Sequence, residues 1–251
     1  MAEDLVLRQI DGPIARLTLN DPSKANALSA AMMEALEAAL AEAAADERVK
    51  VIVLGAAGKI FCAGHDLAEL RASNDAAVNA TLFERCSAVM LAIDACRAPV
   101  IARVQGAAVA AGCQLVASCD LAYAVDTARF AVSGVNLGLF CSTPGVALGR
   151  AVARKRATEM LLTGRFIDAA RAAEIGLING AVPAAELDSV IDETAMLIAA
   201  KPADAIALGK RIFRQQIEAS LEDAYAIASP AMAENLGFES ARAGIDGFLK
   251  R

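Results

Sequence analysis

The chain has 251 residues, of which 57% are hydrophobic and 22% are charged, and its net charge is -6. This composition excludes a disordered or collagen-like chain, because the apolar side chains suffice for a packed core. The acidic balance also gives no indication of a nucleic-acid partner. Six cysteines without a Cys-x-x-Cys pair and a single histidine lack the spacing of a zinc site, so we expect no metal and reduced core thiols.

The N-terminal segment and the longest uncharged run bear on location. The first twenty residues have neither the apolar core of a secretory signal nor the arginine-rich character of a transit peptide, so we expect a cytoplasmic protein. The run 130–149 has the length of a membrane span. Its glycine, proline and polar residues would leave backbone groups unsatisfied in lipid, so we expect a buried loop and strand there, and no membrane contact.

Strands and helices alternate in the first half of the chain. Strands are predicted at 5–10, 13–19, 49–54, 100–104 and 120–125. Helices are predicted at 30–45, at 76–96 and from near Ala111 onward. The pair Asp11-Gly12 predicts a hairpin turn, and Ser29 is expected to cap a helix. This alternation predicts an α/β core.

Helices dominate after residue 150. They are predicted at 151–162, 168–174, 184–200, 202–218, 220–233 and 238–249. Three prolines, Pro183, Pro202 and Pro230, are expected to mark helix starts or breaks.

A first loop, 61–67, follows a buried strand and opens a helix, so it leaves free backbone N–H groups at a positive helix end. Asp66 and Glu69 have capping-box spacing, which favours Asp66 as an N-cap. His65 is the only imidazole, and it is either a structural residue or a base of the site.

A second loop, 106–115, consists mostly of small residues and also leads into a helix. Small residues allow a ligand to approach the backbone closely, although they equally serve tight helix packing. Two such loops, each after a short strand, are typical of a two-donor oxyanion hole.

Five short segments, taken together, give the sequence a specific resemblance to a known family. They are 26–28, 61–67, 106–115, 119–122 and 161–164. In this order and spacing they resemble the enoyl-CoA hydratase/isomerase (crotonase) family over most of the chain. The resemblance implies a spiral of strand-strand-helix units, followed by helices that build homotrimers, often paired into hexamers. On this basis the chain divides into a core at 1–195 that binds acyl-CoA and a helical oligomerisation region at 196–251.

The resemblance also implies roles for individual residues. The ligand is an acyl-CoA, so coenzyme A enters as part of the substrate and no separate cofactor is implied. The backbone N–H groups of Ala63 and Ala111 are implied to form the oxyanion hole. The implied coenzyme A contacts are Lys24, Ala25, Ala63, His65, Asp66, Leu67 and Lys250, the last toward the phosphate of a neighbouring subunit's ligand.

The chain departs from the family pattern at two positions. Hydratases of the family use two glutamates, and Gln114 and Gly134 stand in their places. Glutamine exchanges no proton at useful pH, so losing both acids costs on the order of 10⁴-fold in rate. An oxyanion donor, worth roughly 10²–10³-fold, is retained. His65 and Asp66 are the candidate substitutes, and we expect Gln114→Glu combined with Gly134→Glu to raise hydratase activity.

Three functions remain open from the sequence. The first is a lyase or isomerase that stabilises the enolate of an acyl-CoA with an atypical set of acid–base groups. The second is a non-catalytic protein that binds acyl-CoA, which the missing glutamates favour. The third is a purely structural trimer, which the retained loops disfavour. Cys141 is expected to be a packed thiol, although it could also face the acyl chain.

Overall fold

The computed structural model describes residues 4–72 and 74–250, and its strands form two sheets. The six-stranded sheet has the order β1 (Val6–Asp11), β2 (Ile14–Leu19), β3 (Val51–Ala56), β5 (Val100–Val104), β7 (Leu121–Val125) and β10 (Gly180–Val182). The four-stranded sheet has the order β4 (Ile60–Cys62), β6 (Ala107–Val109), β8 (Arg129–Ala131) and β9 (Ile167–Asp168).

From β3 to β8, consecutive strands alternate between the two sheets. β3, β5 and β7 are parallel neighbours in the larger sheet, and β4, β6 and β8 are parallel neighbours in the smaller one. The chain therefore runs through a strand of each sheet and then a connecting segment, mostly helical, before it returns. This is the α/β spiral of strand-strand-helix units that the resemblance implies.

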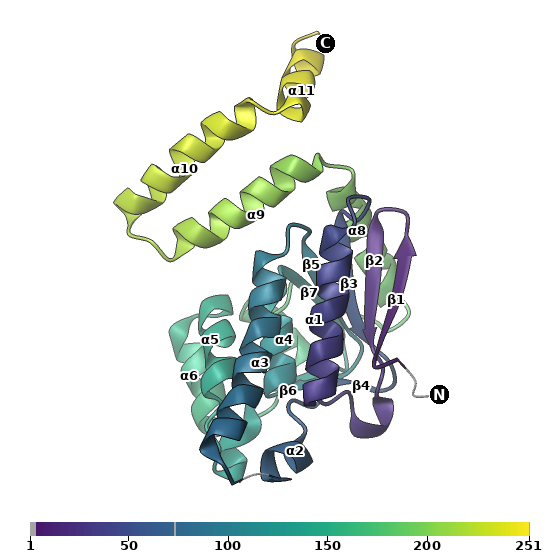
Figure 1. Ribbon diagram of the computed structural model, residues 1–251, viewed down its shortest axis with the longest axis vertical. Helices are drawn as coiled ribbons and strands as arrows, with labels where there is room; N and C mark the ends of the chain where they lie inside the picture. Colours follow the sequence, from purple (N-terminus) through teal and green to yellow (C-terminus); the bar gives the residue numbers. More distant parts are fainter. Residues whose placement is uncertain (1–3, 73, 251) are drawn as a thin grey trace.

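Helices cover the sheets and extend beyond them. The helices of the core are α1 (Ala30–Ala45), α2 (Leu67–Ala72), α3 (Ala76–Ala95), α4 (Ala111–Ser118), α5 (Ser142–Ala151), α6 (Arg154–Thr163), α7 (Ala169–Glu174) and α8 (Leu187–Ala199). Short 3-10 helices lie at η1 (Pro22–Lys24) and η2 (Ser133–Leu137). The C-terminal arm consists of α9 (Ala203–Ile217), α10 (Leu221–Leu236) and α11 (Glu239–Leu249), which extend away from the core (Figure 1).

Helix α1 illustrates how the sequence specifies an element of the core. The Ser29 hydroxyl accepts the Met32 N–H at 3.1 Å, so the helix begins at the predicted cap. Met32, Leu36 and Leu40 recur every four residues and are fully buried. All six residues of β3 are buried, as a central parallel strand requires.

The expectation of a loop and strand over 130–149 is wrong for most of that run. β8 is followed by η2 and then by α5, which contains both Pro144 and Gly145. Pro144 is the third residue of α5, where no N–H has an intrahelical partner, so it does not break the helix. Pro230 likewise lies inside α10 instead of ending it.

Helix α9 attaches the C-terminal arm to the core through an ion-pair cluster. The Lys210 ammonium lies 2.7 Å from Asp120, and its side chain is only 7% exposed. Arg214 contacts the other Asp120 oxygen at 2.8 Å. The expected boundary at residues 195 and 196 falls inside α8, which packs on the larger sheet, so the arm begins with α9.

Helix α3 is long and apolar enough to cross a membrane by length and composition. It is also a core helix, because Cys86, Val89 and Ile93 are fully buried and the helix packs against α1 and α4. Core helices of soluble proteins pass the same measure, so this feature indicates packing and carries no membrane assignment.

Candidate active site

The two candidate loops leave the smaller sheet side by side. β4 pairs in parallel with β6, and Cys62 lies opposite Ala108, so both loops begin at the carboxyl ends of neighbouring strands. A Cβ on Gly112 would overlap the carbonyl group of Cys62, which places the first turn of α4 directly against the end of β4. The strand pairing therefore brings the two loops together.

Gly64 provides a second close contact between the loops. Its φ of +98° lies in the region that favours glycine. A Cβ on this residue would stand 3.0 Å from the Val109 oxygen and 3.4 Å from the Ala111 nitrogen. The backbone of the first loop thus rests against the amide at the start of α4, and a larger residue would separate them.

The start of α4 is strained and presents a free amide. Ala110 has φ 49° and ψ −115°, which is unfavourable for alanine. Its N–H donates to the Ala131 carbonyl at 2.8 Å, and its carbonyl accepts the Gln114 N–H at 3.0 Å. The Ala111 N–H has no acceptor in residues 4–72 and 74–250, as is usual for the first residue of a helix. This amide is available to a ligand.

The first expected donor, Ala63, is engaged elsewhere. Its N–H donates to the Ala25 carbonyl at 3.1 Å, so it is not a free donor. Two residues on, the His65 N–H has no acceptor in the described part of the chain, while the Leu28 N–H is donated to the Gly64 carbonyl at 2.7 Å. The two free amides at this contact between the loops are therefore those of His65, which follows Gly64, and of Ala111. The Ala63 amide is not one of them.

The His65 side chain is largely buried beside α3. Its ring meets the Phe83 ring edge-on, with 5.2 Å between the centroids. Nε2 is buried and has no hydrogen-bond partner among the described residues. Burial lowers the pKa of His65 from its ordinary 6.5, so the imidazole is neutral at pH 7.

Asp66 acts as the N-cap of α2. Its Oδ1 accepts the N–H groups of Ala68 at 2.9 Å and Glu69 at 3.3 Å, and its Oδ2 lies 3.4 Å from the exposed Lys24 ammonium. Burial alone would raise the pKa of Asp66, but these hydrogen bonds and Lys24 outweigh it, so the pKa is lowered. The expected capping box is incomplete, because Glu69 accepts the Ala30 N–H instead.

A third loop, 21–28, borders the first one, and the sequence did not single out its key residue. Asn26 is fully buried and accepts the Asp21 N–H, while its Nδ2 donates to the carbonyls of Ala57 and Ile60, both at 2.8 Å. Asn26 and Ala25 both have φ above 50°. The tolerance of asparagine for this conformation was the one available signal.

Gln114 is buried, with 4% of its surface exposed, one turn into α4. Its Oε1 accepts a weak hydrogen bond from the Cys86 thiol at 3.8 Å. No hydrogen bond from its Nε2 is present within the residues that the structure describes, and Nε2 is not among the fully buried unpartnered atoms. A side-chain donor that is not fully buried at this place fits a contact to ligand or water.

Gly134 lies in η2 and has no room for a side chain. A Cβ there would stand 2.8 Å from Cys141 Sγ and would overlap the Leu139 carbonyl oxygen. The Gly134 N–H donates to Cys141 Sγ at 3.3 Å. A carboxylate from Gly134→Glu therefore requires the turn at 139–141 to shift, and the expected gain in hydratase activity stays a prediction.

Three of the implied coenzyme A contacts, Lys24, Leu67 and Lys250, lie at two separate places in the structure. Lys24 and Leu67 are exposed beside the first loop and are available to a ligand. Lys250 follows α11 at the outer end of the C-terminal arm, far from α2 (Figure 1). Lys250 could meet the loops only as a residue of a neighbouring subunit.

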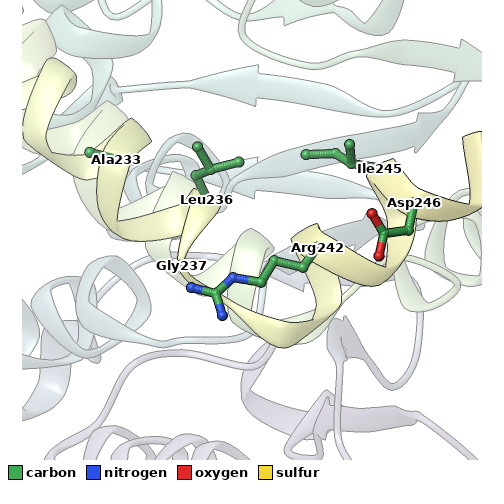
Figure 2. A pocket seen from close by; sticks show the side chains of 6 residues that line it. All are labelled: Ala233, Leu236, Gly237, Arg242, Ile245 and Asp246. Carbon is green, nitrogen blue, oxygen red and sulfur yellow. The ribbon is translucent and has the colours of Figure 1, made fainter. Parts of the chain in front are cut away.

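Two surface cavities lie away from these loops. A cavity of about 440 Å³ opens between α10 and α11, where the side chains of Arg242 and Asp246 border Leu236 and Ile245 (Figure 2). A second cavity, of about 330 Å³, lies between the first hairpin and α1 and includes Arg8. Neither is lined by the residues of the candidate site.

The spiral fold and the paired loops define the class of protein. The family model for enoyl-CoA hydratase/isomerase matches residues 9–251, and the chain belongs to this family. Among curated proteins, the chain is 45% identical to the rat "Enoyl-CoA hydratase domain-containing protein 3, mitochondrial", over 97% of this chain and 81% of that protein. Its Homo sapiens counterpart is 46% identical, over 97% and 80%. The run 133–148 resembles this type of family member, and these matches confirm the resemblance.

Solved structures agree with the sequence comparisons. The chain superimposes on an enoyl-CoA hydratase from Mycobacterium smegmatis with a TM-score of 0.97 at 53% identity, over 99% of this chain and 97% of that one. The structure of human enoyl Coenzyme A hydratase domain-containing protein 3 gives a TM-score of 0.95 at 44% identity, over 98% and 97%. These neighbours confirm the fold class.

The expected cytoplasmic location is wrong, because the rat and human relatives are named as mitochondrial proteins. The expectation rested on the composition of the N-terminal residues. Targeting segments are separate from the folded core that they accompany, so the composition of a folded domain does not indicate its cellular location.

Proposed function

We propose that this protein binds an acyl-CoA thioester and holds its carbonyl oxygen between the N–H groups of His65 and Ala111. The observation that carries this proposal is the close approach of Gly64 to the Ala111 nitrogen, together with the amides of His65 and Ala111, which have no acceptor among the described residues. Two preorganised donors stabilise the negative charge that develops on a thioester oxygen when an enolate forms, and one such donor is worth roughly 10²–10³-fold in rate.

The strain at Ala110 supports a functional role for the start of α4. An alanine at this φ and ψ costs about 1–3 kcal/mol, and such strain persists where the surrounding structure requires it, often at active sites. Coenzyme A would lie along the exposed side of the first loop, beside Lys24 and Leu67. Coenzyme A stays attached to the acyl group as part of the substrate in this scheme, and no other cofactor is proposed.

Ordinary hydration is expected to be slow at this site. Gln114 exchanges no proton, and Gly134 has neither a side chain nor space for one. Asp66 is committed to capping α2. His65 is the remaining acid–base candidate, because its neutral ring has a buried Nε2 without a partner. We therefore place the protein among family members with enolate chemistry that does not use two glutamates.

A non-catalytic protein that binds acyl-CoA is the second candidate, and the filled space at Gly134 favours it. Both candidates predict binding of crotonyl-CoA by titration calorimetry. They differ in turnover: the enzyme exchanges the C4 protons of crotonyl-CoA, whose loss gives a dienolate, with deuterium oxide, or converts the ligand, whereas the binding protein does neither. Absence of binding would contradict both.

We also propose a homo-oligomer, either a trimer or a dimer of trimers, with the C-terminal arm in its interface. The support is the apolar surface of the arm: Leu221, Tyr225, Met232, Phe248 and Leu249 are each at least two-thirds exposed. Light scattering in solution should give three or six times the mass of the chain, and a monomer would contradict this proposal.

A further inference from the structure

Cys141 occupies the place to which a side chain of residue 134 would project. A β-carbon on Gly134 would point at Cys141 Sγ, 2.8 Å away, and the Gly134 N–H already donates to that sulfur at 3.3 Å. The position that carries a glutamate in hydratases is thus filled by the Leu139 carbonyl and by a thiol that the chain supplies seven residues later.

The thiol of Cys141 also lies near the first turn of α4. Cys141 is 7% exposed and directly precedes α5, a helix that packs against α4. It is near enough to Cys113 for the two thiols to interact electrostatically, a smaller contribution than burial to the raised pKa of Cys113. Cys113 is adjacent to Gln114 and lies two residues beyond the Ala111 amide. Cys141 therefore lies near the helix whose first amide is proposed to hold the carbonyl oxygen.

We infer that Cys141 is a specificity-determining residue, which presents a thiol to the acyl chain where a hydratase presents its second carboxylate. This inference rests on the proposed binding of the thioester between His65 and Ala111. On this inference, the turn at 139–141 itself prevents the addition of water. The missing side chain at Gly134 is then not the cause by itself.

The chemistry of hydration explains why a thiol in place of the second carboxylate disfavours this reaction. When water adds to an enoyl-CoA, its oxygen bonds to C3 and its released proton passes to a base. The C2–C3 π bond breaks, and C2 takes up a proton. Burial raises the pKa of the Cys141 thiol, so it stays protonated and cannot accept the proton from water. A bound ligand can still form an enolate, since that step needs only the two amides and a base for the carbon acid.

The test restores a carboxylate at the residue that fills the space. Cys141 is the N-cap of α5 and makes no side-chain capping bond, and aspartate and asparagine are favoured caps. We compare Gln114→Glu/Cys141→Asp with the matched control Gln114→Glu/Cys141→Asn, which has the same shape but no titratable carboxyl group at residue 141. Hydration of crotonyl-CoA should be about 100-fold faster in the aspartate variant than in its control.

Binding of crotonyl-CoA, measured by calorimetry on the parent and both variants, separates the possible failures. If the parent does not bind, the proposed function fails and this inference fails with it. If both variants bind but hydrate at equal rates, this inference alone is overturned. Should the variants not fold, a crystal structure of the parent with crotonyl-CoA decides: Cys141 Sγ should lie within about 4.5 Å of C2 or C3, and a thiol out of contact with the acyl chain would overturn the inference.

Discussion

His65 is the only histidine of the chain, so its titration can be followed by proton NMR without assignment. Because burial lowers the pKa of its ring, the ring proton signals of the folded protein should titrate below pH 6.5. A pKa at or above 6.5 would show that the ring is solvated or paired, and would contradict its placement against Phe83.

The same shift predicts how stability depends on pH. The unfolded chain takes up a proton at His65 near pH 6.5, whereas the folded protein takes it up only at lower pH. The free energy of unfolding should therefore be at its full value above pH 6.5 and should fall as the pH drops from there toward 5. In urea titrations, the free energy of unfolding of His65→Gln should lack this pH-dependent part. An equal pH dependence in parent and variant would contradict the role of His65.

Gly134→Ala tests the space at the second catalytic position. The added β-carbon overlaps the Leu139 carbonyl oxygen, so the turn must shift, at a cost of about 1–3 kcal/mol in the free energy of unfolding. Gly149→Ala in α5 is the control, because nothing lies within 4 Å of its β-carbon and alanine favours a helix. Urea denaturation of both variants should show a loss for the first and none for the second.

At the residue scale, the sequence predicted roles that depend on neighbours along the chain. The Asp66 cap depends on amides two and three residues away, and it was predicted. The bond from the Ala63 N–H to Ala25 joins residues that only the fold brings together, so the donor was assigned to Ala63 instead of His65. The lack of space at Gly134 depends on a turn that local patterns do not predict.

At the scale of elements, the start of α4 carries the strain of the site. Ala110→Gly relieves an alanine held at φ 49° and should raise the free energy of unfolding by about 1 kcal/mol. Ala117→Gly, inside the same helix, should lower it by about the same amount. Thermal or urea unfolding distinguishes them, and a destabilised Ala110→Gly would show that this backbone conformation is not strained.

Long periodic elements could be predicted, and short ones could not. The predicted bounds 30–45 match α1 because its apolar residues repeat over four turns. β4, β6 and β8 have three residues each, too few for a period, and they were assigned to loops or left out. α5 was missed because proline and glycine were taken as breaks, although Pro144 sits where a helix tolerates it.

For the whole molecule, the ion-pair cluster at Asp120 decides how firmly the C-terminal arm is held. Lys210→Met removes a buried ammonium, but Arg214 remains as a partner for Asp120, so the loss in the free energy of unfolding should not exceed about 3 kcal/mol. Arg211→Met breaks an exposed pair with Glu234 and should cost less than about 1 kcal/mol. Urea unfolding compares the two, and equal losses would contradict this role for Lys210.

The spiral architecture as a whole was predicted through the resemblance of five short segments, since composition and periodicity gave only an α/β core. The extension of α9–α11 away from the core was not apparent from periodicity, because a helix that packs on a neighbouring chain has the same apolar pattern as one that packs on its own. The apolar surface of the arm in the structure makes this difference visible.

The central claim is that the amides of His65 and Ala111 together hold one thioester oxygen. Proline at the first position of a helix keeps the helix but has no N–H, and glycine at residue 110 accepts the backbone conformation there. Ala110→Gly/Ala111→Pro thus removes one donor, with Ala110→Gly as its matched control.

The most direct measurement is the infrared stretching frequency of a carbon-13-labelled thioester carbonyl in bound acyl-CoA. It should shift to lower wavenumber on binding to the Ala110→Gly protein, and most of that shift should vanish in the double variant. A bound carbonyl that absorbs where the free ligand does, or a shift that survives the loss of the Ala111 N–H, would contradict the account.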